Sequence, residues 1–363
     1  MLQNAEHSGL LIRQWDSGLV RVQAEPITNE TVPFIDLISK PLGSRVLACS
    51  DEWFAEASNL TTPTSPVRRP GVYTHAGAWY DGWETRRHNP APFDCVIIRL
   101  GVAQGEVRGV EIDTAFFDGN HAPEIAVEGC SAGSDEEVLN ETFQGWETIL
   151  GKQACGPSRR HAWALAKETA KTVTHVRLLM YPDGGIARFR LFGAAVPVFP
   201  ADVHEVFDLA AAVNGGVATS CSDQHFGSRQ NLLLPGRGVD MGDGWETKRS
   251  REPGHTDWVI VRLGAAGEIE RIVVDTAHFR GNFPQSVRVE AILCPGATPD
   301  VNDRGWVELI EPQKCGPDKE HEFAKELRNV AARYYTHVKL VIIPDGGVKR
   351  FRVFGRKEIR SFE

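Results

Sequence analysis

Two short stretches of the chain carry carboxylate and guanidinium or ammonium side chains at the same spacing. They read DGWETRR at 81–87 and DGWETKR at 243–249. Four of the seven residues in each stretch are charged, and neither stretch has the spacing of a packed helix or strand. Charged residues that recur on a loop have few packing reasons to be there, which favours contact with a ligand. Such groups can hold a small anion and transfer protons.

The candidate residues fall into two classes by their chemistry. Candidates for proton transfer are two glutamates and two histidines: Glu84, Glu246, His88 and His278. Candidates for substrate binding can form hydrogen bonds to a carboxylate or to amide groups. They are Arg86, Arg87, Lys248, Arg249, Asp113, Asp275, Asn120, Asn282, Arg190 and Arg352.

Most of these residues also have a structural interpretation. Arg86 can form an ion pair with Asp113. Asp113 ends an apolar strand and can itself accept hydrogen bonds from neighbouring backbone N–H groups. Asn120 follows a glycine, and Asn tolerates left-handed turns. Arg190 lies in an alternating strand and can belong to a solvated face. Trp83 is expected to pack rather than to stack on a ligand. The same alternatives hold for the matching residues of the second stretch.

An internal duplication sets the organisation of the chain. The segments 174–193 and 336–355 are identical at 13 of 20 positions. Further matching pairs are 113–120 with 275–282 and 155–161 with 315–321. Each copy spans about 160–170 residues, the size of a whole domain. We predict an N-terminal extension over 1–30, a first repeat over 31–195 and a second over 203–357, with the boundary in the proline-containing stretch 193–205.

Each copy reads as β structure. Residues 94–101 and 107–114 are β-branched runs with a short glycine-containing connection, which predicts a hairpin. The run 174–182 alternates and stops at Pro-Asp-Gly-Gly, a turn signal. Helical periodicity is limited to pieces such as 161–171 and 319–332. Many short strands predict an all-β chain of two tandem jelly-roll β-sandwiches with short helices.

Composition narrows the functional classes. The formal net charge of −8 argues against a nucleic-acid-binding protein. No run approaches the roughly 18 apolar residues of a membrane helix, and the N-terminus lacks the features of a signal peptide. Seven cysteines without a C-x-x-C pair predict free thiols and a cytoplasmic location. One Cys and one His per copy, Cys155 with His161 and Cys315 with His321, fall short of a tetrahedral metal site. The sequence requires no cofactor and leaves a divalent metal open.

Three motifs recur in the same order in both halves: DGWET(R/K)R, DTAxFxGN and PDGGxxRFRxFG. Together they resemble the repeats of the allantoicase family, over residues 36–355. The resemblance implies sandwiches like the galactose-binding domains and a usually oligomeric assembly. It also implies a hydrolase of purine (allantoin) degradation that converts allantoate and water into ureidoglycolate and urea.

That reaction breaks a carbon–nitrogen bond at a carbon that carries one carboxylate and two ureido groups. It is not acyl transfer at a carbonyl, so a Ser-His-Asp triad is not expected. A guanidinium can hold the carboxylate, an acid can protonate the departing urea nitrogen, and a base can take a proton from water or from the remaining ureido N–H. Each proton-transfer role contributes roughly 10²–10⁴ in rate.

The two copies differ at positions that matter for chemistry. His88 faces Ser250 in the alignment, and Phe116 faces His278. Either one copy is catalytic and the other supports it, or a single site draws on both; we favour the shared site because ligand clefts favour domain interfaces. The alternative functions are a tandem binding module for a sugar or small anion and a structural dimerisation unit.

Overall fold

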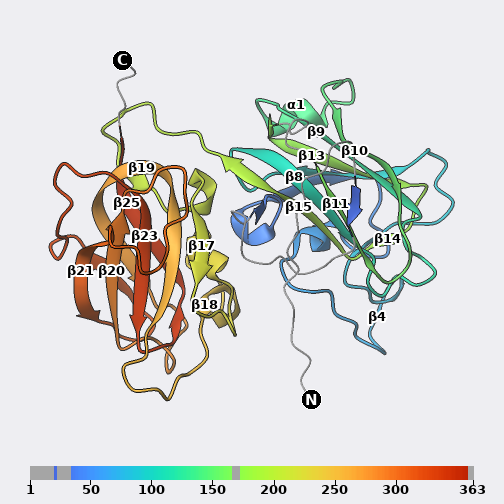
Figure 1. Ribbon diagram of the computed structural model, residues 1–363. Coiled ribbons are helices and arrows are strands. Elements are labelled where there is room, and N and C mark those ends of the chain that lie inside the picture. The colour runs from blue at the N-terminus through green and yellow to red at the C-terminus, as the bar shows by residue number, and fades with distance from the viewer. Residues whose placement is uncertain (1–19, 23–33, 166–171, 359–363) are drawn as a thin grey trace. The chain divides into compact units, whose positions relative to one another are not determined.

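The computed structural model describes residues 20–22, 34–165 and 172–358 (Figure 1). The chain divides after Val196 into two compact units. Among the described residues the one α-helix is α1 (Asp135–Leu139). Short 3-10 helices complete the helical content: η1 (Lys40–Leu42), η2 (Ala57–Thr61), η4 (Ala212–Asn214), η5 (Arg229–Leu233) and η6 (Met241–Asp243). The predicted all-β chain of tandem sandwiches with short helices is confirmed.

Two antiparallel sheets form the sandwich of the first unit. One sheet has the order β1 (Val20–Val22), β11 (Arg160–Ala164), β8 (Gln104–Asp113), β15 (Arg188–Val196), β2 (Ile35–Asp36), with β12 (Thr172–Val173) also on β8. The other has the order β10 (Glu147–Ala154), β9 (Glu124–Cys130), β13 (His175–Tyr181), β7 (Asp94–Arg99), β3 (Arg45–Cys49). Two small pairs are β6 (Trp83–Glu84) with β14 (Gly185–Ile186), and β4 (Tyr73–Thr74) with β5 (Gly77–Ala78).

The second unit repeats this arrangement around one long strand, β19 (Asp257–Asp275). The strand order is β16 (Phe207–Asp208), β25 (Arg350–Lys357), β19, β23 (Tyr335–Ile343), β20 (Ser286–Ile292), β21 (Val307–Lys314). Two further strands, β17 (Val217–Cys221) and β22 (Glu320–Phe323), pair with β19, and β18 (Trp245–Glu246) pairs with β24 (Gly347–Val348).

The predicted hairpin between 94–101 and 107–114 is wrong. β7 pairs with β13 and β3, whereas β8 pairs with β11 and β15, so the two strands belong to opposite sheets. In the second unit the matching residues form the single strand β19, which pairs with β23 along its first half and with β25 along its second. The short connection therefore carries the chain onward from one sheet to the other instead of reversing it.

The predicted helical pieces are also wrong where the structure describes them. Residues 160–164 form β11 and residues 320–323 form β22, each paired with the end of a long strand. The remaining part of the first piece, 166–171, lies outside the described residues. Strand pairing overrides a weak local helical pattern.

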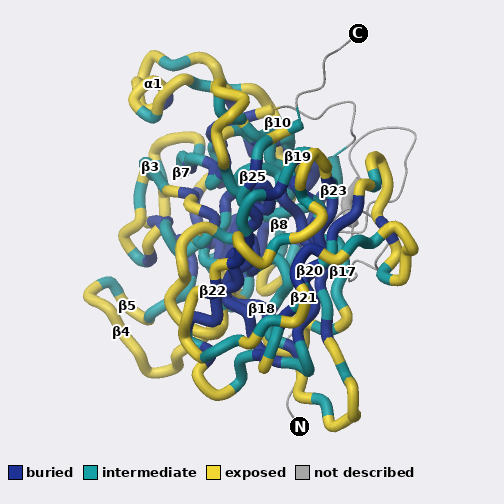
Figure 2. Tube along the Cα trace, turned by 90° about the vertical axis from the view of Figure 1, so that its left-hand side faces the viewer, coloured by how far each residue is buried: buried dark blue, intermediate teal, exposed yellow. Residues whose placement is uncertain are grey.

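Both sandwiches enclose an apolar core. Figure 2 shows buried residues along the strands and exposed residues along the loops. Strand β15 alternates as predicted: Phe189 and Leu191 are fully buried in the core, and Arg188 and Arg190 point to the other face of the sheet. All seven cysteines are free thiols, as the sequence predicts.

Candidate active site

The repeated DGWET motif forms the small β6–β14 pair of the first unit and the β18–β24 pair of the second. Trp83 pairs with Ile186 and Glu84 with Gly185. The Trp83 side chain is fully buried, and its Nε1 donates a hydrogen bond of 2.8 Å to the backbone oxygen of Asp51. The tryptophan therefore packs, as expected, and its burial holds the adjacent glutamate in place.

We call Glu84, Arg87, Asn120 and Asp183 the Glu84 cluster. Asn120 Nδ2 donates a hydrogen bond of 2.6 Å to Glu84 Oε1. Arg87 donates from Nη1 to Asp183 Oδ1 at 3.0 Å and from Nη2 to the backbone oxygen of Gly119 at 3.3 Å. Glu84 is buried, with only 8% of the residue exposed. Burial raises the pKa of Glu84 above its usual value, while the Asn120 hydrogen bond and the Arg87 charge act to lower it.

The cluster explains why three separate motifs carry these residue types. Glu84 comes from the first motif, Asn120 from the second and Asp183 from the third. Asn120 does not have a positive φ, so the left-handed geometry expected for a turn at this residue is not adopted, although the residue lies in a bend. Asn120 instead orients a buried carboxylate, which needs a donor when it is ionised.

The second unit repeats this arrangement as the Glu246 cluster, made of Glu246, Arg249, Asn282 and Asp345. Asn282 Nδ2 donates to Glu246 Oε1. Asp345 accepts a hydrogen bond of 2.8 Å from the backbone N–H of Ser250. Arg249 is exposed and has no ion-pair partner among the described residues. The two clusters thus share the glutamate–asparagine bond and differ in whether an aspartate holds the guanidinium.

No hydrogen bond or ion pair of the described residues joins the side chain of Arg86 or Lys248 to these clusters. The backbone N–H of Arg86 donates to Asp51 Oδ2 at 2.6 Å, and its Nε donates to Asp51 Oδ1 at 3.1 Å. The expected ion pair of Arg86 with Asp113 is therefore wrong, since Asp51 takes that role. The backbone N–H of Lys248 donates to Asp223 Oδ2 at 2.8 Å in the same way. Both residues fix the loop through their backbone.

Both predicted histidines have a left-handed backbone conformation. His88 is exposed and has a φ of 63°, whereas its counterpart Ser250 has no positive φ. His278 has a φ of 68°, and its counterpart Phe116 has 69°, so the left-handed geometry at this position belongs to the fold. A left-handed non-glycine residue stores strain, which accumulates at functional sites. No hydrogen bond of the described residues joins either imidazole to a cluster glutamate.

Asp113 and Arg190 lie on the outer face of the β8 sheet of the first unit, and Asp275 and Arg352 lie on the matching face of the second unit. In the first unit Arg190 lies 3.5 Å from Asp36, and Arg160 lies 3.5 Å from Asp113. Asp113 Oδ1 also accepts from the backbone N–H of Ala115 at 2.8 Å, as the structural interpretation predicts. No hydrogen bond or ion pair of the described residues connects this group to the Glu84 cluster.

The solvated-face interpretation of Arg190 and Arg352 is wrong, because their side chains are only 11% and 15% exposed. Arg188 is 2% exposed and bonds Asp81 Oδ2 at 2.8 Å and the backbone oxygen of Thr64 at 2.9 Å. Asp81 therefore neutralises a buried guanidinium that lies 107 positions further along the chain. The pair clamps the DGWET loop onto the sheet.

The sequence interpretation missed Glu111, which lies two residues before Asp113 on the same face of β8. Glu111 is buried, and burial raises its pKa while the charges of Arg160 and Arg190 act to lower it. The matching residue of the second copy is Val273. The available signal was a single carboxylate in an apolar strand that is absent from the other copy.

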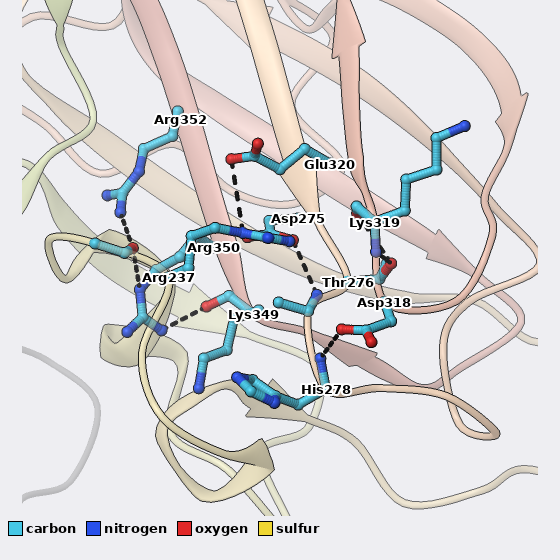
Figure 3. A network of polar contacts seen from close by, with 12 residues as sticks. Arg237, Asp275, Thr276, His278, Asp318, Lys319, Glu320, Lys349, Arg350 and Arg352 are labelled. Carbon is cyan, nitrogen blue, oxygen red and sulfur yellow. Dashed lines mark hydrogen bonds and ion pairs between the residues drawn. The ribbon is translucent and has the colours of Figure 1, made fainter.

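On the matching face of the second unit, the aspartate pairs with an arginine that has no counterpart in the first unit. Arg237 donates from Nε and Nη2 to the two carboxylate oxygens of Asp275, both at 2.8 Å (Figure 3). Arg352 Nη2 reaches the backbone oxygen of Gly236 at 2.9 Å. Arg350 bonds Asp243 Oδ2 at 3.1 Å, as Arg188 bonds Asp81 in the first unit. Arg237 lies in the loop where the two copies differ in length, so the repeat pattern could not identify it.

The described residues contain no group of three or more His, Cys, Asp and Glu side chains placed to hold a metal ion. His161 Nε2 accepts a hydrogen bond of 3.0 Å from the backbone N–H of Gly156, and His321 accepts one of 2.8 Å from Gly316. Both histidines therefore have a structural role in the turn that follows each Cys-Gly-Pro.

The sequence pattern described as the Allantoicase repeat matches residues 35–196 and again residues 207–358. The chain belongs to the allantoicase family. It is 63% identical over 328 residues to the allantoicase of Neurospora crassa, a match that covers 90% of this chain and 92% of that protein. It is 53% identical over 326 residues to the allantoicase of Saccharomyces cerevisiae, covering 88% and 93%. The crystal structure of the Saccharomyces cerevisiae allantoicase matches with a TM-score of 0.77 and 52% identity, covering 89% of this chain and 93% of that one.

The resemblance carried by the three repeated motifs is thus confirmed, and so is the expected function as a hydrolase of the allantoicase family. The matches span both units, which sets aside the binding-module and dimerisation alternatives. Within the described residues no helix has the length and apolar character to cross a membrane.

Proposed function

We propose that this chain hydrolyses allantoate to ureidoglycolate and urea, and that the Glu84 cluster transfers the protons. The buried Glu84 carboxylate, bonded to Asn120 and close to the Arg87 charge, is the observation that carries this assignment. Burial raises the pKa of Glu84 toward neutral pH, and a general base is most effective when its pKa lies near the working pH.

Glu84 acts as the base in this proposal. The Asn120 N–H group and the Arg87 guanidinium both favour the ionised carboxylate, so the group is ready to accept a proton. The proton comes either from the water that attacks the central carbon or from the N–H of the ureido group that remains. In the second case a C=N double bond forms as urea leaves, and water then adds to it, with its hydroxyl on carbon and its proton on nitrogen. The departing urea nitrogen needs one proton, so the same carboxyl group can return what it has taken, and no proton is gained or lost overall. His88 is the second candidate donor.

Arg87 is the proposed partner of the substrate carboxylate. A guanidinium has five N–H donors, and Asp183 and Gly119 engage two of them, one on each terminal nitrogen. The remaining donors can bind a carboxylate while Asp183 holds the group in position. Arg249 offers the corresponding group in the second unit, without a competing carboxylate.

We also propose a cytoplasmic homo-oligomer that needs neither a nucleic acid nor a dedicated cofactor. Free thiols at all seven cysteines are typical of a reducing compartment. The net charge of −8 disfavours a nucleic-acid partner. Light scattering during gel filtration tests the oligomer, and urea release after dialysis against a chelator, with and without added divalent ions, tests the cofactor.

Incubation of the purified chain with allantoate tests the reaction itself. We expect urea and ureidoglycolate in equal amounts. Ammonia in place of urea, or no product under conditions where the protein is folded, would contradict the proposal.

A further inference from the structure

Asp135 is a carboxylate that completes a small charged site in the first unit. It lies in the first turn of α1, and its Oδ1 is 3.0 Å from His175 Nε2. Its Oδ2 is 2.7 Å from Arg45 Nη2, and its Oδ1 is 4.0 Å from Arg99 Nε. One carboxylate of the chain therefore forms a hydrogen bond with a buried imidazole and lies within ion-pair distance of two guanidinium groups.

The second unit retains the histidine and one arginine of this site but lacks the carboxylate. His337 pairs with Arg262 across β23 and β19, as His175 pairs with Arg99 across β13 and β7. Strand pairing also aligns the preceding segment, because Ile292 pairs with His337 as Cys130 pairs with His175. Five residues after Cys130 stands Asp135, and five residues after Ile292 stands Ala297.

This loss leaves polar atoms without partners. His337 is 2% exposed, and its Nε2 is buried with no hydrogen-bond partner among the described residues. Its Nδ1 lies 3.0 Å from Thr336 Oγ1, which matches the 2.8 Å between His175 and Thr174. Arg262 is half-buried, and no ion pair of the described chain involves it. Burial lowers the pKa of His337 to about 4, with a smaller effect of the Arg262 charge.

A cavity of about 850 Å³ lies at this position, within the usual range for small-molecule sites. His337, Arg262, Thr336 and Ala297 line it. Phe199, Phe207, Leu263 and Pro295 give it apolar walls, and Lys357 adds a second cation. The acids that line it are Asp202, Glu205 and Glu358, none of which forms an ion pair with Arg262 within the described residues. No residue of the Glu84 or Glu246 cluster lines this cavity.

We propose that this cavity binds a small carboxylate, whose oxygens occupy the place that the Asp135 carboxylate holds in the first unit. The imidazole Nε2 and the Arg262 guanidinium then bind the two oxygens, and the aromatic and aliphatic walls receive the rest of the molecule. A carboxylate suits this position because in the first unit the matching His175 and Arg99 lie 3.0 Å and 4.0 Å from one. The closer cation of that unit, Arg45, is replaced by Val217 in the second unit, so Arg262 is the cation left to bind the ligand.

Acetate is the simplest probe, and the internal copy suggests the matched variant. Thermal unfolding of the full chain is followed in sodium acetate and in sodium chloride of equal ionic strength. We expect acetate to raise Tm by about 2–4 °C beyond chloride. Ala297→Asp supplies an internal carboxylate, so it should raise Tm in chloride and abolish the response to acetate. Saturation transfer to the acetate methyl protons should likewise be lost in Ala297→Asp.

Arg262→Gln should abolish the acetate response, whereas Arg99→Gln, the same change in the first unit, should retain it. Urea release from allantoate by Ala297→Asp should equal that of the parent chain, which separates this site from the reaction. The proposal is overturned if acetate and chloride have the same effect on the parent chain, or if Ala297→Asp responds to acetate as fully as the parent does.

Discussion

Replacing Asn120 by Ala removes the one hydrogen bond that Asn120 Nδ2 donates to the buried Glu84 carboxylate. A hydrogen bond to a charged group contributes about 1.5–3 kcal/mol. Losing the bond should therefore raise the pKa of Glu84 further above its already raised value. The direction follows from the bond itself, which stabilises the ionised form.

Two measurements report this shift. If Glu84 is the general base, the acidic limb of the kcat/KM profile, measured as urea release at a series of pH values, should move to higher pH in Asn120→Ala, by about one pH unit for each 1.36 kcal/mol that the bond contributes. The free energy of unfolding should fall by about 1.5–3 kcal/mol at a pH where Glu84 is ionised. That loss should shrink as pH falls and disappear below the raised folded-state pKa of Glu84, because the carboxyl is then protonated in the folded protein whether or not Asn120 is present.

Asn282→Ala is the matched control, because it removes the same bond from Glu246 in the second unit. It should leave the acidic limb in place if the first unit carries the base. An Asn120→Ala enzyme with an unchanged acidic limb would refute the assignment of Glu84 as the base.

Three further predictions concern the Asp81–Arg188 pair, the buried Glu111 and the Glu246 cluster. Asp81→Ala leaves the buried Arg188 without its carboxylate, so the free energy of unfolding in guanidinium chloride should fall by about 3–5 kcal/mol; a loss below 1 kcal/mol would show that the pair does not clamp the loop. Glu111→Gln removes a carboxylate whose pKa burial has raised, so the variant should gain stability relative to the parent as pH rises from 4 to 7; the opposite trend would mean that Arg160 and Arg190 outweigh burial. Glu246→Gln should retain most of the urea release if the second unit supports the first, and a loss equal to that of Glu84→Gln would point to two equivalent sites.

The fold could be predicted from the sequence where the pattern is local and repeated. The alternation of Phe189 and Leu191 with Arg188 and Arg190 predicts the two faces of β15, and the duplicated motifs predict two units. The hairpin at 94–114 could not be distinguished from a crossing between sheets, because a short connection does not state whether the chain reverses. Whether the chain reverses or crosses to the other sheet depends on the strands that pair with β7 and β8, and these lie far away in sequence.

The candidate site was predictable to the extent that its residues recur. Glu84 and Asn120 stand in two motifs that both copies repeat, and the structure brings them into contact. Arg188 and Asp81 are 107 positions apart, so their pairing was hidden from local patterns. Glu111 and Arg237 occur in one copy each, and comparison of the copies therefore gave them no support.

The rate of urea release by Glu84→Gln is the most direct test of the central assignment. Glutamine retains the size of glutamate and can still accept from Asn120, so folding should be preserved, as an unchanged or higher Tm would show. We predict that kcat falls by roughly 10²–10⁴ and that the acidic limb attributable to Glu84 is lost. A folded Glu84→Gln enzyme that releases urea at the parental rate would contradict the account.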